Sequence, residues 1–181
     1  MPQGLVRFQE SGQTHFVTFS CVGRQPNFTS AVIYNLFLET LERTRLLFAV
    51  RIYGYVVMPE HVHLLVSEPK NALLYDALRY LKQSFTQRVH SVSMKTGPSW
   101  EKRYYDRNIR DEEEFKIKLR YLHRNPVKRG LVTNPADWKW SSFRHYALRE
   151  VGVVEIESEW TAWNRERRER GGPPRIFLKP A

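Results

Sequence analysis

The sequence predicts an α+β fold, in which a ferredoxin-like βαββαβ antiparallel sheet is followed by an additional helix and a C-terminal appendage. Four segments show the alternation or the β-branched and aromatic content of strands, and two segments between them show apolar residues at helical spacing. The second and third strand segments are separated by only a short break, which joins antiparallel neighbours. A length of 181 residues suits one main domain.

The first strand and the first helix have clear signals. Residues 14–21 alternate polar and apolar side chains, as expected for a strand with one buried face. After a turn, Thr29 or Ser30 can cap a helix that we expect to run to about Leu47. Apolar residues recur along this helix at the spacing that faces a core.

A hairpin follows the first helix. Residues 50–58 are rich in β-branched and aromatic side chains and predict the second strand. Pro59-Glu60 interrupts the pattern, and residues 61–67 resume it as the third strand.

The remaining elements complete the pattern. Asn71 precedes a second helix expected to end near Val92, and residues 100–109 hold the fourth strand. Asp111 can cap a third helix, which we expect to stop near Pro126.

The pattern weakens towards the C-terminus, and we divide the chain at that point. Residues 1–149 form the main domain in this interpretation, and residues 150–181 form a partly helical appendage.

The charge of the chain predicts a polyanionic partner. The formal net charge is +10, and lysine and arginine are spread along the sequence, so they belong to a folded surface. Aromatic residues make up 13% of the chain, and cationic surfaces with aromatic platforms are typical of proteins that hold single-stranded nucleic acid. A basic protein without such a partner is the alternative.

No long apolar run predicts a membrane span, and the N-terminal pattern is not that of a signal peptide. The single cysteine, Cys21, excludes an internal disulfide and is expected to be a small buried residue. Together these features favour a cytoplasmic protein with no membrane partner.

Two sets of residues are candidates for contacts with nucleic acid. The candidate phosphate contacts are Arg79, Lys82, Arg88, Lys102, Arg103 and Arg107. The candidate base-stacking or hairpin-cradling residues are Trp100, Tyr104 and Tyr105. In the alternative interpretation the charges are solvated faces and the aromatic rings are core.

The pair His61 and His63 is the sharpest chemical signal. Side chains two apart on a strand point to the same face, so the two imidazoles can share one divalent metal ion. Two hydrogen-bonded histidines without a metal are an equally weighted alternative, because a short His-x-His pattern is common by chance.

The third helix carries a second signal. Phe115, Leu119 and Leu122 make a narrow apolar stripe, and Tyr121 lies roughly 120° from its centre. Asn125 falls on the same face as Tyr121, four residues on. Beside a two-histidine metal site, a phenol can attack a phosphate that the metal polarises. The alternative is an interfacial tyrosine at the domain edge, with Asn125 as a helix C-cap.

The sequence resembles a known family of proteins. It is similar to the HUH single-strand transposases of the one-tyrosine class, and most of all to the REP-associated tyrosine transposases. Four motifs carry the resemblance, in the expected order within residues 8–146. They are residues 57–64 (Val-Met-Pro-Glu-His-Val-His-Leu), 100–106 (Trp-Glu-Lys-Arg-Tyr-Tyr-Asp), 121–132 (Tyr-Leu-His-Arg-Asn-Pro-Val-Lys-Arg-Gly-Leu-Val) and 140–142 (Trp-Ser-Ser).

The resemblance implies a metal-dependent endonuclease and strand transferase acting on single-stranded, hairpin-forming DNA. It makes His61 and His63 metal ligands, Asn125 the third ligand and Tyr121 the nucleophile that forms a 5′-phosphotyrosine. The metal would be Mg²⁺ or Mn²⁺. Residues 1–149 would then be the catalytic domain with its catalytic helix, and the appendage would regulate or contact DNA.

The sequence is also compatible with two other functions. A catalytically silent regulator that binds DNA hairpins would share the fold, and so would an RNA-binding protein with an RRM-like sheet. Monomer and homodimer are both compatible with the sequence. His123 lies on another face of the third helix and is expected to be solvated.

Overall fold

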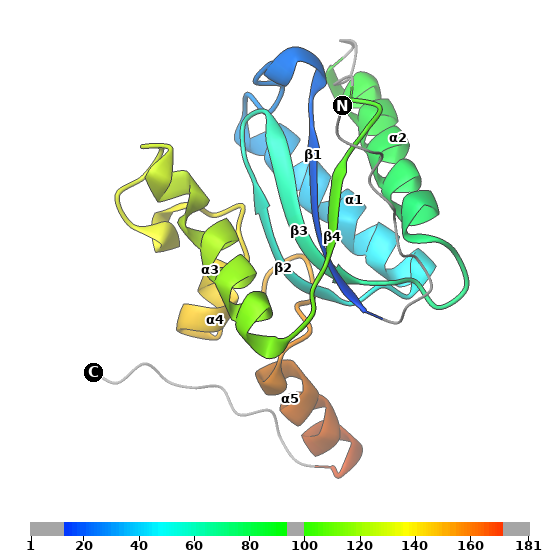
Figure 1. Ribbon diagram of the computed structural model, residues 1–181, viewed down its shortest axis with the longest axis vertical. Coiled ribbons are helices and arrows are strands. Elements are labelled where there is room, and N and C mark those ends of the chain that lie inside the picture. Colours follow the sequence, from blue (N-terminus) through cyan, green and yellow to red (C-terminus); the bar gives the residue numbers. More distant parts are fainter. Residues whose placement is uncertain (1–12, 94–99, 172–181) are drawn as a thin grey trace.

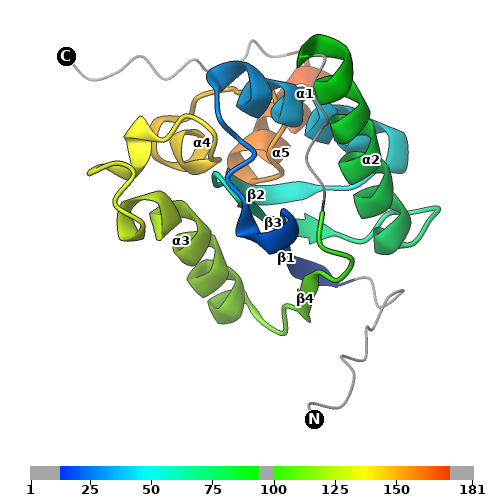
Figure 2. The same ribbon diagram turned by 90° about the horizontal axis from the view of Figure 1, so that it is seen from above.

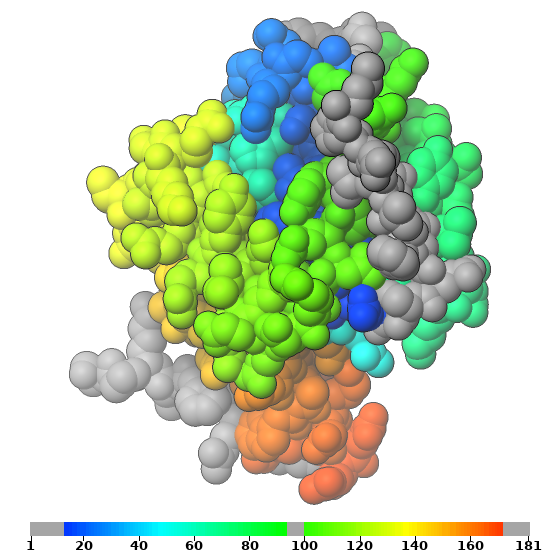
Figure 3. Space-filling model, in the orientation of Figure 1, coloured from blue at the N-terminus to red at the C-terminus, as the bar shows by residue number. Residues whose placement is uncertain are grey.

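The computed structural model describes residues 13–93 and 100–171, which are drawn in colour in the ribbon of Figure 1 and in the space-filling view of Figure 3. The strands are β1 (Thr14–Ser20), β2 (Ile52–Val57), β3 (His61–Ser67) and β4 (Tyr105–Asn108). The helices are α1 (Ala31–Phe48), α2 (Leu74–Ser93), α3 (Glu112–Lys128), α4 (Phe143–Leu148) and α5 (Glu159–Glu169), with short 3-10 turns η1 (Val22–Arg24) and η2 (Pro135–Asp137). Among the described residues no helix is long and apolar enough to cross a membrane.

The four strands form one antiparallel sheet in the order β2-β3-β1-β4. Figure 2 shows α1 and α2 on one face of this sheet and α3 on the other. The order and the two helices on one face confirm the predicted ferredoxin-like α+β fold with an additional helix.

The face covered by α1 and α2 holds the main hydrophobic core. Val17 and Phe19 of β1 and Leu64 of β3 point to this face and are fully buried, as are Phe37 of α1 and Phe85 of α2. Cys21 is buried as predicted.

A glycine brings α3 close to the opposite face of the sheet. A Cβ atom built on Gly54 of β2 would lie 2.7 Å from Cδ1 of Leu119 and 3.4 Å from Cδ2 of Leu122. A larger residue at this position would push the helix away. Gly54 therefore sets the distance at which the other α3 side chains meet β3.

The predicted caps are confirmed, and the end of α3 is corrected. The side chains of Ser30 and Asp111 accept hydrogen bonds at the first turns of α1 and α3. However, α3 does not stop near Pro126 but continues to Lys128, with Pro126 inside its last turn. Proline removes only its own N–H, and Arg129 N still donates to Asn125 O at 3.0 Å.

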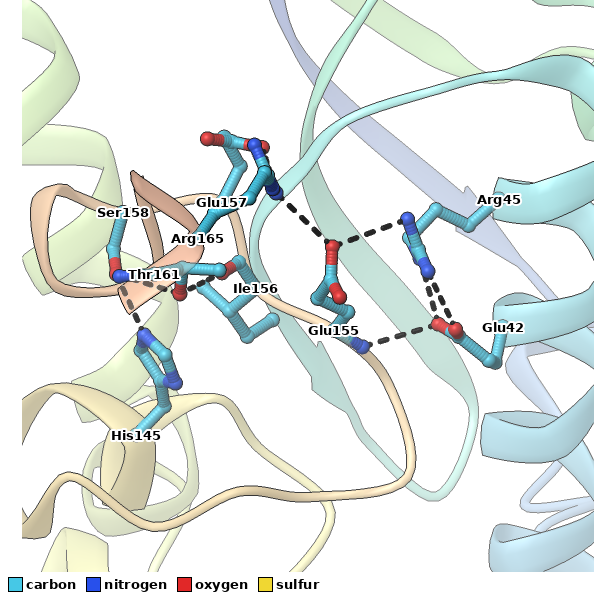
Figure 4. A network of polar contacts seen from close by, with 9 residues as sticks. All are labelled: Glu42, Arg45, His145, Glu155, Ile156, Glu157, Ser158, Thr161 and Arg165. Carbon is cyan, nitrogen blue, oxygen red and sulfur yellow. Dashed lines mark hydrogen bonds and ion pairs between the residues drawn. The ribbon is translucent and has the colours of Figure 1, made fainter. Parts of the chain in front are cut away.

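The first part of the predicted appendage packs against the core. Val154 and Ile156 are buried among the core residues, and Glu157 N donates to Ile52 O at 2.7 Å. In Figure 4, the neighbouring Glu155 backbone N–H and carboxylate contact Glu42 and Arg45 of α1. The division at residue 150 stays a prediction, but continuous packing with the domain extends at least to residue 157.

Candidate active site

The two histidines of β3 converge on one point. His61 and His63 are both buried, and their Nε2 atoms lie 3.0 Å apart. The other ring nitrogens are held from behind, because His61 Nδ1 lies 3.1 Å from Glu60 Oε1 and His63 Nδ1 lies 2.7 Å from Thr18 Oγ1. A neutral imidazole that donates from Nδ1 presents the lone pair of Nε2, so the two lone pairs face each other.

Burial keeps this pair uncharged. It lowers the pKa of His61, which Glu60 partly offsets, and it lowers the pKa of His63 to about 3. The positive charges of Arg24 and Lys118 lower the pKa of His63 further, and a proton on His61 would do the same. Both rings are therefore neutral near pH 7, which is the form that binds a metal ion.

Asn125 supplies a third polar group from α3. Its side chain is buried, and Nδ2 lies 3.1 Å from His63 Nε2. Rotating the amide by 180° turns its carbonyl oxygen towards the same point. Among the residues that the structure describes, no group of three or more His, Cys, Asp or Glu could hold a metal ion. An amide oxygen is a further kind of metal ligand, and Asn125 offers one beside the two imidazoles.

The donor set fits a small divalent cation. Two nitrogens at right angles around one ion, each at about 2.1 Å, are about 3.0 Å apart. That value matches the separation of the two Nε2 atoms. The amide oxygen suits both Mg²⁺ and Mn²⁺, and of these two ions Mn²⁺ accepts imidazole nitrogen more readily.

Tyr121 lies beside this cluster and is 40% exposed. Its ring packs edge-on against His63 at 5.4 Å and against Phe16 at 6.0 Å between ring centroids. The position off the apolar stripe is therefore confirmed, since Leu122 is fully buried. Lys118 and Lys128 place their Nζ atoms 5.9 Å and 5.4 Å from the Tyr121 ring centroid.

The sequence alone does not predict the residues that support the two histidines. Arg129 Nη1 lies 2.7 Å from Glu60 Oε1, so this ion pair links the end of α3 to His61. Burial alone would raise the pKa of Glu60, but the neighbouring His61 and Arg129 hold it below its usual value. The only signal in the sequence is the position of Glu60 next to the histidine pair, where the pattern predicts a strand break.

The expectation for His123 was wrong. The residue is buried, its Nε2 atom lies 2.8 Å from Ser142 Oγ, and burial lowers its pKa to about 3. The reason is tertiary, because α4 and the segment before it cover this side of α3.

The candidate phosphate contacts fall into two groups. Arg88 links α2 to α1, through Nη1 to Thr40 Oγ1 at 2.7 Å and Nη2 to Glu39 Oε2 at 2.6 Å. Arg107 pairs with Glu114. Both arginines thus contribute to the fold.

The remaining basic candidates lie nearer to solvent. Arg79 is exposed and 3.5 Å from Asp76, and Lys82 Nζ lies 5.8 Å from the Tyr104 ring centroid. Lys102 and Arg103 are exposed just before β4.

The three aromatic candidates differ in the same way. Trp100 packs edge-on against Phe19 at 5.2 Å, and Tyr104 is buried. Tyr105 is exposed and lies opposite Thr18 in the β1–β4 pairing, on the same face of the sheet as His63. The DNA contacts of all these residues stay predictions.

The fold and this cluster define a class of protein. A ferredoxin-like sheet that presents a histidine pair to a helix with tyrosine and asparagine is the arrangement implied for one-tyrosine transposases. The chain belongs to the family described as IS200-like transposases, whose model matches residues 9–125. The resemblance noted in the sequence is therefore confirmed.

Two relatives extend the likeness along almost the whole chain. A Haemophilus influenzae protein named as a REP-associated tyrosine transposase is 28% identical over 179 residues, which cover 93% of each chain. The REP-associated tyrosine transposase of Escherichia coli K12 is 24% identical over 156 residues, covering 86% of this chain and 91% of the relative.

A solved structure shares the fold. It is that of a REP-associated tyrosine transposase bound to a REP hairpin. The TM-score is 0.68 at 22% sequence identity, with 86% of this chain and 92% of that chain covered.

Proposed function

We propose that this chain is a metal-dependent single-stranded DNA endonuclease and strand transferase that acts at hairpin-forming repeats through a 5′-phosphotyrosine intermediate. The observation that carries the proposal is the cluster at His63 Nε2, which lies 3.0 Å from His61 Nε2 and 3.1 Å from Asn125 Nδ2, beside the accessible Tyr121. Membership of a transposase family supports the same reaction.

In this proposal His61, His63 and Asn125 hold Mg²⁺ or Mn²⁺. When bound, the ion offsets negative charge on the scissile phosphate and orients it for in-line attack. Glu60 and Thr18 fix the two imidazole rings, and Arg129 fixes Glu60.

Tyr121 is the proposed nucleophile. Its hydroxyl oxygen forms a bond to phosphorus, the bond from phosphorus to the 3′ oxygen breaks, and a 3′-hydroxyl is released. The tyrosine proton passes to solvent, and a proton from solvent completes the leaving hydroxyl. The phosphodiester energy stays in the tyrosine ester, so the strand can later be rejoined without ATP. Lys118 and Lys128 beside the ring favour the developing negative charge.

The proposed partner is single-stranded DNA folded into a hairpin. The net charge of +10 supports a polyanionic partner, and one protein with the same fold is bound to a REP hairpin. We expect the protein to act in the cytoplasm.

The test is the formation of a covalent adduct. Protein, Mn²⁺ or Mg²⁺ and labelled hairpin DNA are mixed, and a protein–DNA band that survives denaturation is sought. We expect the adduct with the wild type and none with Tyr121→Phe or in EDTA. Peptide mass spectrometry should place the nucleotide on Tyr121. Hairpin binding without any adduct would instead identify a catalytically silent regulator.

A further inference from the structure

A groove lies on the far side of α3 from the ligand cluster. It encloses about 590 Å³ between α3 and the segment that contains η2 and α4, which lies beside α3 in both ribbon views (Figures 1 and 2). Its α3 side is formed by residues such as Leu119 and Val127. At 100° per residue, these positions lie roughly opposite Asn125 on the helix. The catalytic proposal makes no use of this groove.

The floor of the groove is firmly held. His123 donates to or accepts from Ser142 Oγ at 2.8 Å, and its ring contacts those of Phe143 and Tyr146 at 5.5 Å and 5.6 Å. The Tyr146 hydroxyl donates to the Tyr53 carbonyl oxygen at 2.6 Å. The groove therefore exists before any ligand arrives, and aromatic residues contribute to its wall.

The rim of the groove is positively charged. Lys116, Arg120 and Arg124 line it, four residues apart along α3, and its lining contains no carboxylate. Lys116 pairs with Glu112 at 2.6 Å. Arg120 and Arg124 are exposed, and within the described ranges neither forms an ion pair. Two guanidinium groups are thus available one helical turn apart beside an aromatic surface.

We propose that this groove binds the unpaired DNA strand next to the hairpin, with Arg120 and Arg124 on its phosphates and its bases against the aromatic wall. This inference rests on the proposed function. Arginine suits phosphate, and aromatic side chains suit the faces of unpaired bases. The volume is in the range of small-molecule sites, which fits a few unpaired nucleotides and excludes a duplex.

The groove also adjoins the proposed nucleophile. Arg124 follows Tyr121 by three residues, so the two side chains are neighbours on the exposed surface of α3. A strand that leaves Tyr121 can cross one turn of the helix and enter the groove. The strand would then be held on both sides of the catalytic helix, which would fix the scissile phosphate between them.

The experiment separates the hairpin from its flank. Fluorescence anisotropy in EDTA compares a blunt hairpin with the same hairpin carrying an unpaired 5′ or 3′ extension, in a Tyr121→Phe background that cannot cleave. The test variant is Arg120→Ala with Arg124→Ala. The control is Arg43→Ala, an exposed arginine of α1 on the other side of the sheet.

We expect the double variant to bind one extended hairpin roughly tenfold more weakly and the blunt hairpin equally well. The slope of the logarithm of the binding constant against the logarithm of the salt concentration should become less steep by about 1.4, because two single-strand phosphate contacts are lost. Arg120→Lys with Arg124→Lys should recover most of the affinity, and Arg43→Ala should change neither DNA.

Other outcomes overturn the inference. An equal loss on blunt and extended hairpins would assign the arginines to the hairpin or to general attraction, and no loss on either would leave the groove without this role. If the parent protein bound no hairpin at all, the proposed function would fail together with the inference. Circular dichroism melting of each variant checks that the fold is intact.

Discussion

Two sets of buried histidines lie on opposite faces of the same sheet, and their surroundings are different. His15 of β1 faces α1 and α2, and its ring nitrogens lie 2.7 Å from Asp106 Oδ1 and 2.9 Å from Glu68 Oε1. His61 and His63 face α3, and their Nε2 atoms point at each other. Burial lowers the pKa of His61 and His63, whereas the two carboxylates overcome burial at His15 and raise its pKa.

The comparison separates a structural histidine from a histidine pair that is proposed to bind a metal ion. In His15 both ring nitrogens contact carboxylates, which favour the charged form of the ring, so His15 joins the ends of β1, β3 and β4 and presents no free lone pair to a metal ion. In His61 and His63 only one nitrogen is used for support. Burial alone does not distinguish the two sites, because all three histidines are buried. The difference lies in the carboxylate neighbours of His15, which the local sequence does not indicate.

The largest expected effect is on the neutral pair. His63→Ala should abolish DNA cleavage and remove a site for Mn²⁺, while the melting temperature stays close to that of the wild type because no charged partner is left unpaired. Cleavage of labelled hairpin DNA and titration with Mn²⁺ in a Tyr121→Phe background measure the two properties. Full cleavage by His63→Ala would remove the distinction between the sites.

The opposite result is expected for His15. His15→Ala leaves the buried Asp106 carboxylate and the partly buried Glu68 carboxylate without this cation and should lower the free energy of unfolding by about 3–5 kcal/mol. Below its melting temperature the variant should still cleave DNA. Chemical denaturation gives the stability.

Adding Asp106→Asn and Glu68→Gln to His15→Ala is the matched control. This triple variant should regain part of the lost stability, since it no longer contains the uncompensated charges. No recovery would show that packing, and not charge, explains the loss.

The sequence was sufficient to predict which residues are buried between the sheet and the helices α1 and α2. There, the alternation of side chains in β1 and β3 and the helical spacing of apolar residues in α1 and α2 predict which residues are buried. The histidine pair and the off-stripe position of Tyr121 were also visible, because side-chain direction in a strand or helix follows from spacing.

Contacts between segments that lie far apart in the chain could not be predicted from the sequence. The burial of His123 depends on α4, the support of His61 depends on Arg129, and the packing of Ile156 depends on the edge of β2. Each contact joins segments that local patterns cannot relate. The burial of Tyr104 and the partial burial of Trp100 against the core have the same origin.

The predicted appendage offers a third test of the comparison. Its residues Val154 and Ile156 pack in the hydrophobic core and not against the histidine pair. Ile156→Ala should destabilise the protein by about 2–4 kcal/mol and leave cleavage by the folded protein unchanged. A truncation at residue 150 should cost more, and a truncation after residue 158 should cost less. Thermal melting of the three proteins tests this order, and equal stability of both truncations would contradict it.

The smallest expected effect is the pH dependence of the His15 contribution. The folded-state pKa of His15 is raised, so protons bind more tightly in the folded protein than in the unfolded chain. The stabilisation is therefore complete below the unfolded pKa of about 6.5 and is lost as the pH rises through the folded pKa. The difference in unfolding free energy between the wild type and His15→Gln should be constant at acidic pH and should shrink as the pH rises. A difference that instead grew with pH would mean that His15 is neutral in the folded protein and resembles His63 after all.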